Sequence, residues 1–103
     1  MVRNILSLVF TRDEMERLTI VECAGKDPRI IADVHGMKCR QARRFINNII
    51  NIVRGAFQLI IIHGYNHGTA IKDMLLEQPI NSHISEQHVD PRNKGITHML
   101  IAA

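Results

Sequence analysis

Apolar residues recur along the chain in patterns that predict a domain of mixed helices and strands. The clearest pattern lies between Lys38 and Arg54, where Gly55 then stands in the usual position of a helix-ending glycine. The apolar positions of this segment follow helical spacing and would line one buried face: Ala42, Phe45, Ile46, Ile49 and Val53. We therefore predict a helix over residues 38–54.

The segments on either side of this helix are predicted to be strands. Residues 29–34 follow Pro28 and form a short apolar run rich in β-branched residues. Residues 57–62 are apolar at nearly every position, as in a strand buried on both faces of a parallel sheet. The order of strand, helix and buried strand predicts a right-handed βαβ unit.

The rest of the second half predicts one short helix and a hairpin. A glycine-punctuated turn at residues 64–68 precedes a helix over about residues 69–77, which Pro79 prevents from continuing. Two weaker strands, residues 84–89 and 96–101, flank a turn. The predicted fold class is therefore α/β, an α+β two-layer sandwich of order βαβαββ, with a mixed four-stranded sheet packed by two helices.

The first 28 residues are predicted to be a helical extension of a domain that spans residues 29–103. Thr11 and Glu14 form a capping-box pattern. Apolar residues then recur at helical spacing as far as Val21, so we expect a helix over residues 11–24. A β-branched run within residues 18–23 favours a strand instead. Residues 1–10 are apolar and do not decide between a strand and an apolar extension.

Composition narrows the class of protein. A chain of 103 residues that is 46% hydrophobic is typical of one folded domain. It contains no apolar run of about 18 residues, so we expect no membrane partner, and we favour a monomer. Cys23 and Cys39 lie outside C-x-x-C spacing, so we expect two buried apolar thiols and a cytoplasmic location. The histidines do not adopt a zinc-site spacing, so no metal ligand is assigned.

Positive charge is concentrated in the second half of the chain. Residues 1–34 carry five Lys and Arg against six Asp and Glu, whereas residues 35–103 carry eight against four. No acid interrupts residues 38–54, where we assign four cations to nucleic-acid binding: Lys38, Arg40, Arg43 and Arg44. Such a stretch attracts phosphate backbones, although a merely solvated helix face would show the same pattern.

Candidate chemistry lies where the two predicted parallel strands end. Asp33 and His35 end the first strand, and His63 follows the second. Because ligands gather at the carboxyl ends of parallel strands, we expect these segments to meet at one edge of the sheet. Asp33 could orient His35 as a general acid or base. The loop that follows could bind phosphate through its backbone and the start of the next helix, through Gly64, Tyr65, Asn66, His67, Gly68, Thr69 and Lys72.

The motifs at these strand ends resemble those of a known family. The sequence reads D-V-H-G at residues 33–36 and L-I-I-I-H-G at residues 59–64, with a helix between them and a glycine turn after them. This pairing is similar to the Smr (small MutS-related) domain family over about residues 30–101. The resemblance implies a fold similar to the C-terminal domain of a bacterial translation initiation factor, and it implies DNA nicking or RNA cleavage.

By matching position, the resemblance assigns roles to particular residues. Asp33 and His35 correspond to the family's D-x-H pair, while His63 and the loop glycines correspond to its glycine-loop motif. Two positions depart from the family pattern, because Ala32 replaces the usual Leu and Asn66 stands where many members have Gly.

These observations predict a nucleic-acid-binding domain with endonuclease (nicking) activity on RNA or on branched or single-stranded DNA. The catalytic candidates are Asp33, His35 and His63. Asp33 could hold Mg²⁺, or a ribose 2′-hydroxyl could act as nucleophile without a metal. The alternative is a non-catalytic adaptor that binds RNA or the ribosome. A small phosphometabolite enzyme is a third hypothesis, against which the missing second acid and the basic helix argue.

Overall fold

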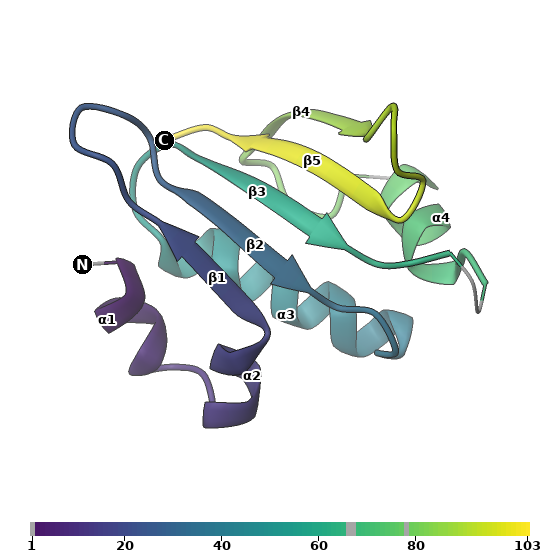
Figure 1. Ribbon diagram of the computed structural model, residues 1–103, viewed down its shortest axis with the longest axis horizontal. Helices are drawn as coiled ribbons and strands as arrows, with labels where there is room; N and C mark the ends of the chain where they lie inside the picture. The colour runs from purple at the N-terminus through teal and green to yellow at the C-terminus, as the bar shows by residue number, and fades with distance from the viewer. Residues whose placement is uncertain (1, 66–67, 78) are drawn as a thin grey trace.

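A computed structural model describes residues 2–65, 68–77 and 79–103. Within these residues the chain forms a five-stranded mixed sheet with four helices, and the strand order is β1-β2-β3-β5-β4 (Figure 1). The elements are, in chain order, α1 (Val2–Ser7), α2 (Arg12–Glu16), β1 (Leu18–Val21), β2 (Arg29–Asp33), α3 (Cys39–Ile52), β3 (Phe57–Ile62), α4 (Ala70–Glu77), β4 (Ile84–Val89) and β5 (Ile96–Ile101).

The N-terminal segment corrects two expectations. The capping box at Thr11 is present, but helix α2 ends at Glu16 and a strand, β1, begins at Leu18. The helix expected over residues 11–24 is therefore wrong beyond its first turns, and so is the four-stranded sheet. β1 pairs antiparallel with β2, with Leu18 opposite Ala32. The strand prevails because alternation turns Leu18 and Ile20 towards the core, while Thr19 and Val21 stay exposed.

The segment predicted as an extension also packs into the core of the domain. Leu6 and Leu18 are buried, and the ring of Phe10 meets that of Phe45 on α3 edge to face, with centroids 5.1 Å apart. This geometry is a favourable aromatic contact. Residues 6–18 therefore share one hydrophobic core with the rest of the sheet.

The elements of the second half agree with the sequence pattern. β2 and β3 are parallel and joined by α3, which confirms the strand–helix–strand order. β4 and β5 have the bounds expected for the hairpin and pair antiparallel, and β5 also pairs antiparallel with β3. The last strand along the chain is therefore an inner strand of the sheet.

The helices lie on one side of the sheet. In Figure 1, α3 crosses behind the strands, and α4 lies beside the edge at which β2 and β3 finish. α3 directs its apolar stripe at this sheet face, where Ile30, Leu59 and Ile61 have no exposed surface. The opposite face carries half-buried side chains such as Ile31 and Ile60. None of the helices described in the structure is long and apolar enough to cross a membrane.

The two cysteines depart from the expected burial. Cys23 is exposed because it lies in the turn after β1, and Cys39 is half-buried at the start of α3. Both thiols are free.

Candidate functional site at the ends of β2 and β3

The two sequence motifs meet at the carboxyl ends of β2 and β3. Asp33 is in register with Ile62, and the backbone N–H of Val34 donates to the carbonyl oxygen of Ile62 at 2.9 Å. Gly64 has a φ of +74°, and a side chain placed there would lie 3.7 Å from Cβ of His35. The convergence expected from the sequence is therefore confirmed, and the positive φ explains why glycine occupies position 64.

A pocket of about 650 Å³ opens where these segments meet. His35 and Gly36 line it from the end of β2, and Ile71 and Lys72 line it from α4. The remaining walls come from the segments that follow β3 and precede β5, and they include Ile62, His63, Gly64, Tyr65, Gly68, Asn93, Gly95 and Ile96. The pocket is thus built from both halves of the chain.

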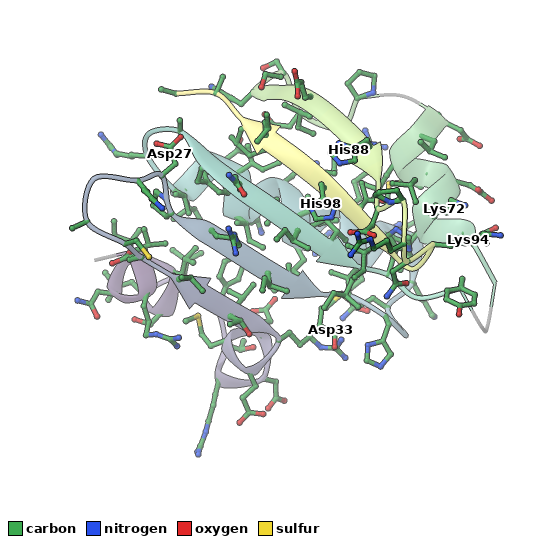
Figure 2. The ribbon with its side chains drawn as sticks, turned by 45° about the horizontal axis from the view of Figure 1, so that its top comes forward. Asp27, Asp33, Lys72, His88, Lys94 and His98 are labelled. Atoms are coloured by element: carbon green, nitrogen blue, oxygen red, sulfur yellow. The ribbon has the colours of Figure 1, made fainter. Side chains whose placement is uncertain are left out.

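Asp33 and His35 form a hydrogen-bonded pair at this edge. Oδ1 of Asp33 contacts Nδ1 of His35 and also accepts the backbone N–H of His35 at 3.2 Å. The side chain of His35 is 66% exposed and that of Asp33 is 37% exposed. Because the carboxylate accepts the proton on Nδ1, Nε2 is left as the basic nitrogen, and no described residue pairs with it. The pair lies at the end of β2, where Figure 2 labels Asp33.

Arg17, which precedes β1, holds the backbone on either side of this pair. Its guanidinium Nη1 donates to the carbonyl oxygens of Asp33 at 3.1 Å and of His35 at 3.2 Å. The backbone N–H of Asp33 in turn donates to the carbonyl oxygen of Arg17 at 2.9 Å. These contacts fix the direction in which the chain leaves β2. No motif in the sequence pointed to Arg17, because its role depends on the strand that the helical interpretation had excluded.

His63 is buried, with only 6% of its surface exposed. Its Nδ1 lies 3.0 Å from the carbonyl oxygen of Gly64, and its Nε2 lies 2.8 Å from the hydroxyl oxygen of Thr97 on β5. In the neutral ring, Nδ1–H donates to that carbonyl and Nε2 accepts the hydroxyl proton. Both nitrogens thus have partners within the protein, so the geometry suits a residue that positions the glycine loop. A catalytic role for His63 stays a prediction.

The turn between β4 and β5 forms the wall opposite His35. The carbonyl oxygen of Gly95 accepts the backbone N–H groups of His63 at 2.9 Å and Gly64 at 3.0 Å. A side chain at Gly95 would lie 3.1 Å from Cα of Gly64 and 3.2 Å from Cδ1 of Tyr65. Glycine at position 95 therefore allows the loop and the Tyr65 ring to approach the turn closely. The sequence marked Gly95 as a turn residue and did not indicate this contact.

Asp90 stabilises the same turn. Its Oδ1 accepts the backbone N–H groups of Arg92 at 2.8 Å and Asn93 at 3.0 Å, and its Oδ2 lies 2.7 Å from Nε2 of His98. The pKa of the Asp90 carboxyl is lowered, first by the hydrogen bond from His98 and next by the one from Arg92. The ring of His98 stacks on that of His88, the residue opposite it on β4, as Figure 2 shows.

The loop residues assigned to binding fall into three groups. Tyr65, Gly68 and Lys72 line the pocket, and Figure 2 shows Lys72 and Lys94 at the same end of the sheet as Asp33. The hydroxyl of Thr69 donates to Oδ2 of Asp73 at 2.8 Å, which places a carboxylate beside the first turn of α4. Asn66 and His67 lie outside the described residues.

The predicted binding cations lie on and beside the first turns of α3. All four are exposed. Lys38, Arg40 and Arg44 line a groove of about 330 Å³, together with Glu14 of α2. Arg43 does not line this groove. Among the described residues, no group of three or more His, Cys, Asp or Glu side chains could hold a metal ion.

Comparison with known proteins gives no relative from which a role could be transferred. No family model matches the chain, and neither the curated proteins nor the solved structures contain a match. The resemblance of the two motifs to the Smr family therefore stays a prediction, and the function has to be argued from the site.

Proposed function

We propose that this chain is an Smr-like nucleic-acid-binding domain with endonuclease activity on RNA or on branched or single-stranded DNA. The observation that carries the proposal is the Asp33–His35 pair at a pocket that the glycine loop also lines. An imidazole oriented by a carboxylate is a common general base, and the exposed side chain of His35 can reach a bound strand.

The pair supports a specific reaction on an RNA strand. Nε2 of His35 takes the proton of a ribose 2′-hydroxyl while its oxygen bonds to the adjacent phosphorus. The bond between that phosphorus and the 5′-oxygen of the next nucleotide breaks, and this oxygen takes a proton from water. The products are a 2′,3′-cyclic phosphate and a free 5′-hydroxyl. On DNA, which lacks the 2′-hydroxyl, His35 would instead deprotonate an attacking water.

Asp33 is a poor ligand for Mg²⁺ in this arrangement. Its Oδ1 already accepts two hydrogen bonds from His35. Mg²⁺ binds through one or two carboxylates and keeps most of its waters, but no described carboxylate joins Asp33 in a metal-binding group. We therefore assign no step of the reaction to a metal ion, and we expect cleavage of RNA to continue in a chelator.

Binding is assigned to the exposed cations of α3 and to Lys72 beside the pocket. Contacts from Lys and Arg to phosphate supply most of the affinity of such modules and make that affinity salt-dependent. The phosphometabolite hypothesis is not carried further, because the carboxylate of Asp73 lies at the turn of α4 where a small phosphate would bind.

The second candidate is a non-catalytic adaptor that binds RNA or a ribosomal surface. One observation favours it: the described lining of the pocket contains no carboxylic acid that could protonate the leaving oxygen. An adaptor needs the cations and the pocket but not the Asp33–His35 pair.

One experiment separates these functions. Purified protein is incubated with labelled single-stranded RNA, nicked DNA and branched DNA, each with Mg²⁺ and with EDTA. Products with a 2′,3′-cyclic phosphate in both conditions would support the RNA reaction. Cleavage only with Mg²⁺ would contradict the metal-independent route. Binding without cleavage of any substrate would leave the adaptor, and no binding at all would refute both.

A further inference from the structure

Two hollows on the surface share one side chain. The pocket at the ends of β2 and β3 and the groove between α2 and α3 are both lined by Met37. Met37 is half-buried and lies two residues after His35. The two hollows are therefore neighbours, separated by a flexible apolar side chain, and His35 lies at the pocket beside their junction.

The pocket has the features of a binding site for a flat apolar ring. Four of its described wall residues are aliphatic or thioether side chains, namely Met37, Ile62, Ile71 and Ile96. Tyr65 lies against Gly95 and keeps 54% of its surface exposed. An exposed aromatic ring held against backbone provides a surface on which a base can stack, at low cost in side-chain entropy.

The groove has the features of a binding site for a charged backbone. Lys38, Arg40 and Arg44 line it with the amides of Gln41 and Asn48, and Glu14 is the acid among its described lining residues. The groove is walled by α2 of the N-terminal segment, so it belongs to a part of the chain outside the motifs on which the proposed function was based.

We propose that the two hollows form one track for a single strand. An unpaired base occupies the pocket against Tyr65, the phosphodiester beside it passes His35, and the phosphates of the neighbouring nucleotides lie in the groove. A base in a duplex is stacked and paired on all sides, so it cannot enter a pocket of this kind without leaving the helix. This inference rests on the proposed function, and it adds a preference for unpaired strands and a direction for the bound chain.

The first test concerns the pocket. An oligouridine of about 12 nucleotides, within the site sizes of single-strand binding modules, is compared by fluorescence anisotropy with a fully paired RNA hairpin. We expect the single strand to bind on the order of tenfold more tightly or better. Tyr65→Ala should weaken binding of the single strand by roughly 5- to 150-fold and leave the hairpin unchanged. Tyr65→Phe, which keeps the ring, should behave as the wild type.

The wild-type protein offers an independent readout. Tyr65 is the only tyrosine of the chain, and the chain has no tryptophan. Its intrinsic emission therefore reports on the pocket alone. Saturating oligouridine should quench it through stacking, whereas the hairpin should leave it unchanged. Unaltered emission on saturation with the single strand would overturn the stacking contact.

The second test concerns the groove and uses variants matched in charge. Arg40→Gln with Arg44→Gln is compared with Arg29→Gln and Arg54→Gln, two exposed arginines outside the groove. The groove pair should lower the log–log salt slope for oligouridine by roughly 0.7 for each lost phosphate contact, and the control pair should not. Glu14→Gln keeps an acceptor for the capping box and should tighten binding, because it removes the acid from the track.

The outcomes separate this inference from the proposed function. Failure to bind any nucleic acid would refute both. Binding of hairpin and oligouridine with equal affinity, unaffected by Tyr65→Ala, would refute the single-strand track and leave the proposed function standing. Equal salt slopes for the groove pair and its control would refute the path through the groove.

Discussion

The guanidinium of Arg17 donates to the carbonyl oxygen of His35 at 3.2 Å. This contact joins the N-terminal segment to the candidate general base, and a second bond from the same nitrogen reaches the carbonyl oxygen of Asp33. A residue that the sequence placed in an extension therefore sets the backbone of the site.

The first prediction is that Arg17 acts as a positioning residue. Arg17→Met removes both hydrogen bonds and should lower the free energy of unfolding by about 1–3 kcal/mol. Cleavage should fall in kcat with KM little changed, because substrate binds elsewhere. Arg17→Lys, which can restore one of the two bonds, should recover part of kcat. A purely structural role would instead lower stability and leave kcat per folded molecule unchanged.

The second prediction concerns the general base. His35→Ala should reduce cleavage by about 10²–10⁴-fold, as expected when an acid–base group is lost. Affinity for uncleaved RNA should stay the same, because phosphate contacts determine it. His83→Ala serves as the control, since that imidazole hydrogen-bonds Asn81 in an exposed turn. Full activity of the His35 variant would remove His35 from the mechanism.

The third prediction concerns the helix cations. Changing Arg40, Arg43 and Arg44 together to Gln should weaken binding and flatten its salt dependence by roughly 0.7 per lost contact on single strands or 0.9 on duplex DNA. The fold should survive, because the three side chains are exposed while Ala42 and Phe45 between them are buried. Circular dichroism and salt-dependent titrations check both parts. Unchanged affinity and slope would show that these arginines only solvate the helix.

The fourth prediction concerns Gly95. In Gly95→Ala the new methyl group would lie 3.1 Å from Cα of Gly64, which is backbone and cannot rotate away. We expect a loss of about 1–3 kcal/mol in the free energy of unfolding, typical of overpacking, and a change in the emission of Tyr65. Urea denaturation measures the first effect and fluorescence the second. A variant as stable as the wild type would show that the turn and loop are not in close contact.

The fifth prediction is a pH dependence centred on Asp90. Its folded-state pKa is lowered from the ordinary value of 3.8, so its charge stabilises the fold above that value, and the stabilisation is lost as pH falls through the folded pKa. Asp90→Asn keeps an acceptor for the turn but loses the charge that faces His98. The variant should therefore be less stable than the wild type near neutral pH, and the difference should shrink below pH 3.8. Urea midpoints measured across this range check the sign.

The sequence predicted those parts of the fold that are encoded by local periodicity. The amphipathic pattern of α3 and the apolar run of β3 gave the correct elements, and the motifs at the two strand ends predicted the convergence of Asp33, His35 and the glycine loop. β1 was missed because helical spacing and β-branched content conflict over residues 18–21. Tertiary pairing with β2 decided that conflict, and no local pattern reports such pairing.

Half of the pocket could not be predicted for a related reason. Thr97 and Gly95 enter the site only because β5 lies beside β3, and that neighbour relation is a property of the sheet order. The burial of His63 follows from the same pairing. Its spacing in the sequence was equally consistent with an exposed catalytic imidazole.

The position of β5 between β3 and β4 also has a consequence in time. Ribosomes make a chain from its N-terminus, so Asp33 and His35 emerge long before Gly95, whose carbonyl secures the loop. Until the final described strand has paired, the loop lacks its anchor and the cleft has no far wall. A nuclease built in this order would stay inactive while its own message is being read, and would begin to cut only after the finished polypeptide has left the ribosome.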